Sequence, residues 1–228
     1  MADNQLLAAL PAEDYARLSP GLSVVTFSLG DVVYESQRRM DHVFFPTTSH
    51  VSLLYTMVDG STAEVGLVGN EGLVGIALFM GGDTTPNQAI VQGSGEALRM
   101  SAAAMQAEFN HGGAFQLAAL RYTQALITQI SQTAVCNRLH TTEQRLCRWM
   151  LMTHDRRRSD ELQMTHEFIS HMLGIQREAV TVTAGCLQEK GAISYKRGRI
   201  KIISRQILEE FCCECYEVVR LEHHRLIG

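Results

Sequence analysis

The 228-residue sequence has no run of about 18 uninterrupted apolar residues, so it predicts no membrane-spanning segment. Its first residues, Met1-Ala-Asp-Asn-Gln5, contain no basic segment leading into an apolar stretch and predict no secretory signal. All six cysteines lie at or after Cys136, too sparsely for a secreted disulfide framework. We therefore expect a cytoplasmic globular protein with reduced thiols, no membrane partner, and cysteines buried as small apolar residues.

Catalytic patterns are missing as well. The sequence has no Gly-x-Ser-x-Gly and no P-loop, and no Cys–His pair stands out as catalytic. A metalloenzyme built on a β-barrel would need clustered histidine and carboxylate ligands on neighbouring strands. Only His42 and His50 fall in the β-rich part of the chain, and not at His-x-His spacing. A cupin-like enzyme is the alternative that these absences oppose, and we predict that the protein is not an enzyme.

Positive charge is scarce in the first part of the chain. Residues 1–137 hold 5 Lys and Arg against 12 Asp and Glu, whereas residues 138–228 hold 15 against 12. No Lys or Arg occurs between Arg39 and Arg99. An acidic first part joined to a basic second part favours contact with a polyanion through the second part alone.

Short β-like runs alternate with turn signals up to about residue 110. The strongest signal is Asp59-Gly60, which separates two apolar runs and is typical of a hairpin. Short strands at regular spacing predict a β-barrel or β-sandwich as the first part of the chain. The expected strands span residues 22–27, 32–34, 42–45, 51–55, 63–68, 89–92 and 96–100. Short helices are expected at 5–10 and, capped by Ser101, at 101–109.

A long helical pattern runs from Ala114 to about Val135. Three of its residues recur at seven-residue spacing, and others fill the positions between them, as in the seam of a coiled coil. We therefore predict a homodimer whose interface contains Leu120, Thr123, Ile127, Ile130 and Ala134. The alternative is that this face packs on the chain's own β domain, and one helix can do both.

A helix over residues 145–153 is expected next, with Thr141-Thr-Glu-Gln144 as its capping signal. The charged, apolar-free string from His154 to Glu161 then predicts a solvated loop.

Residues 165–191 predict two short helices joined by a tight turn. Thr165 caps the first helix and Gly174 ends it, where a left-handed backbone disfavours other residues. Gln176 begins the second helix, whose Val180 and Leu187 face back into the core. This spacing is typical of a helix-turn-helix.

A basic hairpin follows the two helices. The runs 192–195 and 200–203 bracket Lys196-Arg-Gly-Arg199, and residues 176–201 hold six Lys and Arg against two Asp and Glu. Such a wing predicts binding to double-stranded DNA, with cations on phosphates and Arg177 presenting its fork to a guanine edge. The candidate DNA contacts are Thr165, Gln176, Arg177, Glu178, Thr181, Lys196, Arg197 and Arg199.

These motifs resemble the Crp/Fnr family of transcription regulators over almost the whole chain. The string from Gln176 to Val180 is similar to the family's Ser-Arg-Glu-Thr-Val at the start of the recognition helix, which implies base contacts by Arg177 and Glu178. Val182 stands where the family often has a second base-reading Arg. The resemblance implies an α+β fold with an N-terminal antiparallel, jelly-roll-like β-roll as the sensor (1–110). It further implies a dimerisation helix (111–137), a winged helix-turn-helix (138–228), and RNA polymerase as a further partner.

The resemblance also implies a small-molecule effector, but the residues that hold cyclic AMP in the family are absent. Leu73 stands where a ribose-binding Glu is expected, Asn87-Gln88 replaces the phosphate-binding Arg-Ser/Thr, and Ile130 occupies the helix position that faces the base. A buried phosphate without a cation is costly, so we predict that cyclic AMP is not the effector. The effector stays unknown and no cofactor is predicted. A cyclic-nucleotide or other small-ligand module that signals through protein contacts is the alternative function.

Iron–sulfur members of the family use an N-terminal cysteine cluster, which this chain lacks. Cys212, Cys213 and Cys215 fall on an expected helix from Arg205 to about Arg220. Adjacent helical positions point about 100° apart, so we expect these three thiols to be buried separately rather than to converge on a metal. A redox or metal role is the alternative.

Overall fold

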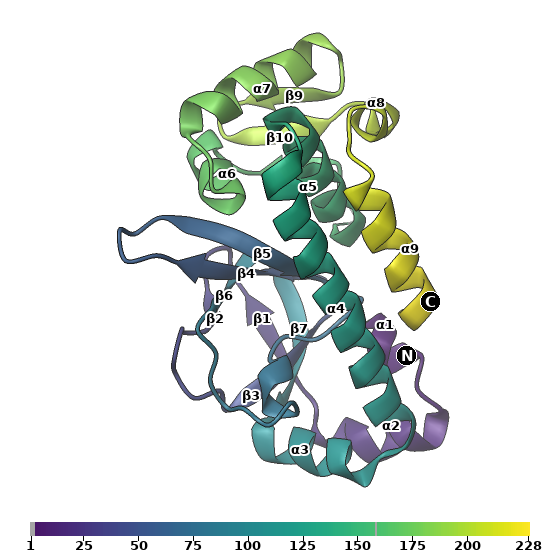
Figure 1. The fold of residues 1–228 in the computed structure, drawn as a ribbon. Coiled ribbons are helices and arrows are strands. Elements are labelled where there is room, and N and C mark those ends of the chain that lie inside the picture. The colour runs from purple at the N-terminus through teal and green to yellow at the C-terminus, as the bar shows by residue number, and fades with distance from the viewer. Residues whose placement is uncertain (1–2, 158) are drawn as a thin grey trace.

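The computed structural model describes residues 3–157 and 159–228. Met1 and Ala2, in the segment expected to lack a signal, and Arg158, in the charged string, lie outside the described residues. Figure 1 shows a β-roll below, a long helix α4 (Gly113–Leu139) running diagonally upward, and a second half above. Helix α9 (Cys215–Ile227) packs along α4 and ends close to α1 (Gln5–Ala8). No helix among the described residues has the length and apolar character needed to cross a membrane.

The roll consists of two antiparallel sheets, with strand orders β1-β7-β3 and β2-β6-β4-β5. Each expected strand is confirmed within one or two residues of its expected ends. The strands are β1 (Ser23–Phe27), β2 (Val32–Tyr34), β3 (His42–Pro46), β4 (His50–Thr56), β5 (Thr62–Val68), β6 (Gln88–Gly93) and β7 (Gly95–Ser101). The β4–β5 hairpin turns at the expected Asp59-Gly60, where Gly60 has a φ of +85° that favours glycine.

Short helices close the ends of the roll. They are α1 (Gln5–Ala8), α2 (Ala12–Leu18), the 3-10 turns η1 (Ser19–Gly21) and η2 (Ile76–Leu78), and α3 (Ala102–His111). Ser101 caps α3 as expected, since its hydroxyl accepts a hydrogen bond from the N–H of Ala104 at 3.2 Å. Helix α2 is not predicted from the sequence, because Pro11 indicates a break rather than the start of a second short helix.

The second half combines helices with a three-stranded sheet of order β8-β10-β9. Its elements are α5 (Thr142–Arg156), β8 (Glu161–Gln163), α6 (His166–Leu173), α7 (Arg177–Glu189), β9 (Ile193–Lys196), β10 (Arg199–Ile202), α8 (Arg205–Glu210) and α9. The expected capping box is present: Thr141 accepts from the N–H of Gln144, whose side chain accepts from the N–H of Thr141 at 3.0 Å. The short β8 is not predicted, because only Leu162 within it is buried.

Each half has its own hydrophobic core, and the halves meet at the β4–β5 hairpin. Helix α4 closes the first core with residues such as Phe115, which is fully buried. Leu54 and Leu67 of the hairpin belong instead to the core of the second half. At the hairpin end, the hydroxyl of Thr62 donates to the carbonyl of His171 at 3.3 Å. The roll therefore contacts the α6–α7 pair directly.

The charged string 154–161 is only partly the solvated loop that its composition predicts: Ser159 and Asp160 are exposed outside any helix or strand, but residues 154–156 are helical. Helix α5 continues to Arg156, whose guanidinium forms an ion pair with Glu71 of the roll at 2.7 Å, with both side chains about 10% exposed. The same guanidinium donates to the carbonyl of Met152 at 2.8 Å. These partners offset the desolvation of the charge, which a composition-based interpretation does not anticipate.

The prediction of a single helix from Arg205 to about Arg220 is also wrong. Helix α8 ends at Glu210 and α9 begins at Cys215, with residues 211–214 between them. The break follows from tertiary packing rather than from a local signal. Phe211 packs against the second core, and the ammonium of Lys190 lies 3.6 Å from the centroid of its ring.

Candidate DNA-binding surface and effector cavity

Helices α6 and α7 form a helical pair whose turn is fixed by a cap and a glycine. The hydroxyl of Thr165 accepts from the N–H of Phe168 at 3.1 Å and caps α6. Gly174 ends α6 with a φ of +60°, as expected. Val180 and Leu187 of α7 are fully buried in the second core. These contacts determine which side of α7 faces solvent.

The solvent-facing side of α7 combines charged, polar and apolar groups. Arg177 and Glu178 are exposed on its first turn. Thr181 is exposed one turn later, and its hydroxyl lies 2.9 Å from Nδ1 of His166. Val182 is 67% exposed although it is apolar. An arginine fork, a carboxylate and apolar surface thus face outward on one short segment.

The β9–β10 hairpin forms a basic wing. Its turn places Arg197 and Gly198 in the left-handed region, with φ of +50° and +76°, as a two-residue hairpin turn of type I′ requires. Lys196 and Arg199 are paired across the hairpin and exposed, and Lys201 is exposed two residues further along β10. The tip of the wing is therefore cationic on the solvent side.

The wing packs against the start of α6. The N–H of Met164 donates to the carbonyl of Gly198 at 2.9 Å, and the ring of His166 stacks on Tyr195 with centroids 4.0 Å apart. Burial, and then the charge of Arg177, lower the pKa of His166 and so favour the neutral form of the stacked imidazole. The wing, α6 and α7 consequently present one surface. The sequence-predicted residues on it are all exposed: Thr165, Gln176, Arg177, Glu178, Thr181, Lys196, Arg197 and Arg199.

A cavity of about 240 Å³ lies between the roll and α4. Leu73, Asn87 and Ile130, which the sequence places at effector-contacting positions, line it. The hydroxyl of Tyr34 donates to Oδ1 of Asn87 at 3.4 Å, and burial raises the pKa of Tyr34 to about 12. Among the described residues that line this cavity, none carries a charge. Its chemistry suits an uncharged ligand rather than an anion.

A second cavity of about 380 Å³, which the sequence does not predict, lies between the roll, α4, α5 and α9. Its wall contains the Arg156–Glu71 ion pair and Arg205, whose guanidinium donates to Asp155 at 2.7 Å. Tyr122 also lines it, and burial raises the pKa of its hydroxyl above the usual range. This cavity is therefore charged, in contrast to the one inside the roll.

The side of α4 away from the roll carries an exposed apolar strip. Leu120 and Ile127 are 49% and 47% exposed, and Ala134 is exposed one heptad later. Thr123 and Ile130 do not share this strip: Thr123 is 5% exposed, and Ile130 is half-buried against the roll. They face their own domain because α4 also closes the roll. The other exposed residues that fill the strip are Leu117, Gln124, Ser131 and Val135.

Models of two known domains match the chain. The model of the cyclic nucleotide-binding domain matches residues 24–111, from β1 to the end of α3. The model of the Crp-like helix-turn-helix domain matches residues 144–211, from α5 to the end of α8. The two matches lie in the order that the sequence resemblance implies, with α4 between them. The chain belongs to the Crp/Fnr family.

Solved structures share the fold of this Crp/Fnr protein over most of its length. A protein from Eubacterium rectale, described as a transcriptional regulator of the family, has a TM-score of 0.72 at 14% identity, covering 90% of this chain and 96% of that chain. FixK2 from Bradyrhizobium japonicum has a TM-score of 0.72 at 13% identity, covering 84% and 98%. The c-di-GMP-responsive regulator CLP from Xanthomonas campestris has 0.66 at 14%, covering 85% and 100%. No curated sequence matches the chain.

The sequence analysis missed some residues of the candidate DNA-binding surface and misplaced one residue of the cavity between the roll and α4. Lys201 shares a face of β10 with Arg199, and the two-residue period of a strand was the available signal. His166 and Tyr195 stack across separate elements, for which the sequence carries no signal. Gln88, expected beside Asn87 at the effector site, does not line the cavity.

Proposed function

We propose that this Crp/Fnr-type transcription regulator acts as a homodimer that inserts α7 of each subunit into the major groove of an inverted-repeat operator. The observation that carries the proposal is the exposed first turn of α7, with Arg177 and Glu178, beside a basic wing. The major groove admits an α-helix and displays a distinct pattern for each base pair. We assign residues 1–110 to the sensor, 111–137 to the dimerisation helix and 138–228 to DNA binding.

Four exposed positions of α7 read the bases in this proposal. Arg177 donates two hydrogen bonds to O6 and N7 of a guanine, and Glu178 accepts from N4 of a cytosine. Thr181 contacts an adjacent base edge. Val182 lies on the same face and suits the methyl group of a thymine, because it is exposed and apolar. An arginine at that position would read a guanine instead, so we expect a half-site that differs from those of members with arginine there.

The remaining contacts position the protein on the phosphates. Thr165 and Gln176 stand at the N-cap positions of α6 and α7, where N–H groups face outward and favour anions. Lys196, Arg197 and Arg199 of the wing neutralise phosphates of the flanking DNA without reading sequence.

The homodimer is proposed to form through the apolar strip of α4. Leu120, Ile127 and Ala134 recur once per heptad on the exposed side, and a second copy of the strip would remove them from water. We retain Thr123 and Ile130 only as residues that support this helix from within their own subunit. Two-fold symmetry then separates the half-sites by about one helical turn, roughly 34 Å.

We further propose that cyclic AMP does not control the protein. The cyclic phosphate keeps one negative charge at neutral pH, and the described lining of the roll cavity offers no cation to pair with it. An uncharged or differently shaped ligand, a protein partner, or expression level alone would then set the activity. Family membership supports RNA polymerase as a protein partner, and we propose no catalytic role.

The second candidate function is a small-ligand module that signals through protein contacts, which the 240 Å³ cavity supports. Selection of DNA fragments from a random library, followed by gel-shift titration, separates the two. The proposed regulator enriches an inverted repeat and binds it at least about 1,000-fold more tightly than random DNA. Failure to enrich any sequence, together with binding of a small ligand seen by thermal shift, would favour the module.

A further inference from the structure

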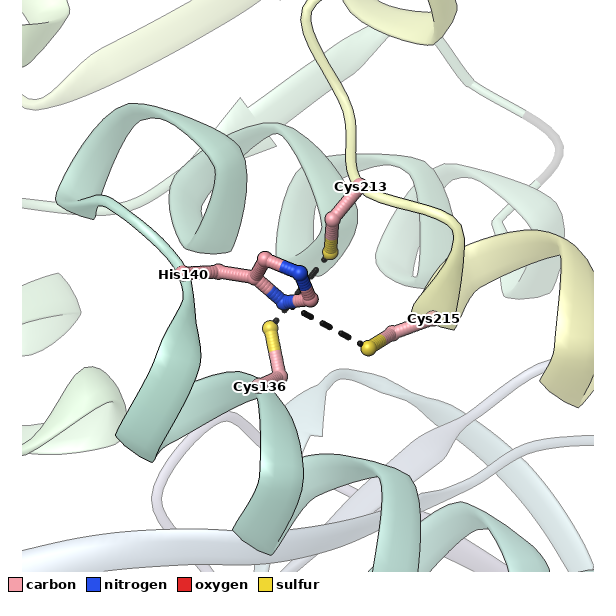
Figure 2. Close-up of side chains that lie close together, drawn as sticks. All are labelled: Cys136, His140, Cys213 and Cys215. Atoms are coloured by element: carbon pink, nitrogen blue, oxygen red, sulfur yellow. Dashed lines mark hydrogen bonds between the residues drawn. The ribbon is translucent and has the colours of Figure 1, made fainter.

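Four side chains that commonly bind metals meet at the upper end of α4, away from the surfaces described above (Figure 2). Cys136 and His140 lie four positions apart, so both side chains emerge on the same face at the end of α4. Cys213 and Cys215 approach from the segment before α9. One ligand atom of each residue lies within 4.8 Å of those of the others.

The spacing of these atoms fits a single tetrahedral ion. Sγ of Cys136 lies 3.5 Å from Sγ of Cys213, and Sγ of Cys215 lies 3.5 Å from Nδ1 of His140. With zinc–sulfur bonds of about 2.3 Å, two sulfur ligands at a tetrahedral angle lie about 3.8 Å apart. We propose that Cys136, His140, Cys213 and Cys215 bind one zinc ion in a structural Cys₃His site.

The surroundings of the histidine support this assignment. His140 directs Nδ1 to Cys215, while its Nε2 lies 3.3 Å from a carboxylate oxygen of Glu214. A metal-bound histidine generally donates its second N–H to a carboxylate or carbonyl, which fixes the tautomer that exposes the other nitrogen to the metal. Glu214 lies between the two cysteine ligands, so one short segment supplies two thiolates and the carboxylate that orients the imidazole.

Burial and charge around the cluster also favour a thiolate-bound cation. Cys136, Cys213 and Cys215 are buried and pack together as a small cluster of their own. Three thiolates and a neutral imidazole leave a zinc ion with a net charge of about −1. The guanidinium of Arg148 is 6% exposed and interacts electrostatically with Cys136 and Cys215. Its Nη2 donates to Thr133 at 2.8 Å, but its buried Nε has no partner among the described residues. A zinc–thiolate centre offsets this buried positive charge.

A single ion fits better than the two other uses of clustered cysteines. A disulfide between Cys136 and Cys213 requires the sulfurs to be about 2.05 Å apart, whereas they are separated by 3.5 Å. A two-iron cluster divides its four ligands between two irons and spreads them further apart than one ion does. Four tetrahedral nitrogen and sulfur ligands without an open position are typical of structural zinc.

The proposed zinc joins segments that lie far apart in the sequence. His140 is the C-cap residue of α4, and the next helix, α5, starts at Thr142. Cys213 and Cys215 set the start of α9, which packs along α4. Binding replaces three S–H protons with zinc–sulfur bonds and releases those protons to solvent. The ion thereby fixes the junction between α4 and the second half of the chain, independently of any DNA contact.

The first test uses the full-length protein purified under reducing conditions and loaded with Zn²⁺. Elemental analysis after removal of free metal should find about one zinc per chain. Replacement of zinc by Co²⁺ should give the visible spectrum of a tetrahedral site with thiolate-to-metal charge-transfer bands, which needs no mutation. Chelation should lower the midpoint of thermal unfolding, since bound metal stabilises only the folded state.

The second test uses variants. Cys213→Ser and Cys136→Ser should each lower zinc affinity by more than about 100-fold, because a hydroxyl does not replace a thiolate ligand. Glu214→Gln should lower it by about 10–100-fold through the histidine it orients. Cys186→Ser, at an exposed position on α7, and Cys212→Ser, beside the site but outside the ligand set, are the matched controls and should retain the ion.

Four results would overturn the proposal. The first is wild-type protein that holds no zinc after loading and gives no cobalt spectrum. The second is a chromophore with equal amounts of iron and sulfide, which would indicate an iron–sulfur cluster. The third is a Cys136–Cys213 disulfide, found by peptide mapping, in protein that cannot be loaded. Loss of zinc in Cys212→Ser would show that the ligand set is wrong.

Discussion

The roll keeps the imidazole of His50 neutral in its interior, whereas the surface of α7 and the wing leaves its cations exposed. His50 is buried, and both of its ring nitrogens lack a partner among the described residues. Burial, aided by the charges of Arg157 and Arg156, lowers the pKa of His50 to about 3. In the second half, Arg177 and Arg197 are exposed to solvent.

This difference separates two kinds of ligand within one chain. A cavity lined without charge desolvates an anion at a cost that nothing offsets, so it favours neutral ligands. Exposed cations on a helix and a wing retain their water until a polyanion displaces it and its counterions. The apolar strip of α4 lies between the two regions and would join two subunits without adding charge.

The largest effect is expected where a charge is placed on that strip. The double variant Leu120→Asp/Ile127→Asp should weaken the dimer by at least about 100-fold, because each carboxylate would be buried without a partner. Sedimentation equilibrium measures this directly. Ala103→Asp, on the exposed side of α3, is the control and should leave the dimer unchanged. A wild-type protein that is monomeric at micromolar concentration would refute the proposal that the apolar strip of α4 forms a dimer interface.

Removal of single cations should distinguish base reading from phosphate binding. Arg177→Ala should cost about 1–3 kcal/mol on the selected operator and little on random DNA. The comparison variant Arg197→Ala should weaken binding to the operator and to random DNA alike. It should also reduce by about one the slope of the logarithm of the binding constant against the logarithm of salt concentration. Gel-shift titrations at several salt concentrations give both quantities. Equal losses on operator and random DNA for both variants would show that the roles are misassigned.

The neutral histidine of the roll predicts a loss of stability in acid. Between pH 6.5 and 3 the unfolded state protonates His50 while the folded state does not, so the unfolded state binds more protons and stability falls as pH falls. The loss should reach about 2 kcal/mol at pH 5. Urea unfolding across this pH range should show a smaller acid loss in His50→Phe. The same pH slope in both proteins would contradict a neutral buried His50.

The smallest effect is expected from cyclic AMP. The nucleotide should give no saturable heat in titration calorimetry at micromolar concentrations and should leave operator affinity unchanged, because its phosphate finds no cation in the described lining of the roll cavity. Cyclic GMP should behave alike. A dissociation constant in the low micromolar range, with tighter operator binding, would mean that backbone N–H groups replace the missing arginine.

Much of the fold was predictable because its signals are local. Asp59-Gly60 fixes a hairpin, Thr165 a helix start and Gly174 a helix end, each through the conformation of one or two residues. The exposed residues of the wing and α7 followed from the same signals together with charge.

Features that depend on packing were not predictable in the same way. A heptad pattern gives the spacing of Leu120 and Ile127, but not that Thr123 turns toward the roll, because that depends on which side of α4 the sheets cover. Likewise, Phe211 interrupts the expected C-terminal helix through a tertiary contact. Because the sequence does not predict that break, it also does not predict that Cys213 lies next to Cys136.

The central claim, that two copies of α7 read an inverted repeat, is tested most directly by hydroxyl-radical footprinting of the selected operator, with the protein-to-DNA ratio measured on the same complex. The account predicts two protected half-sites with centres about one helical turn, roughly 34 Å, apart, and two chains per duplex. Protection of a single non-palindromic half-site by one chain would contradict it.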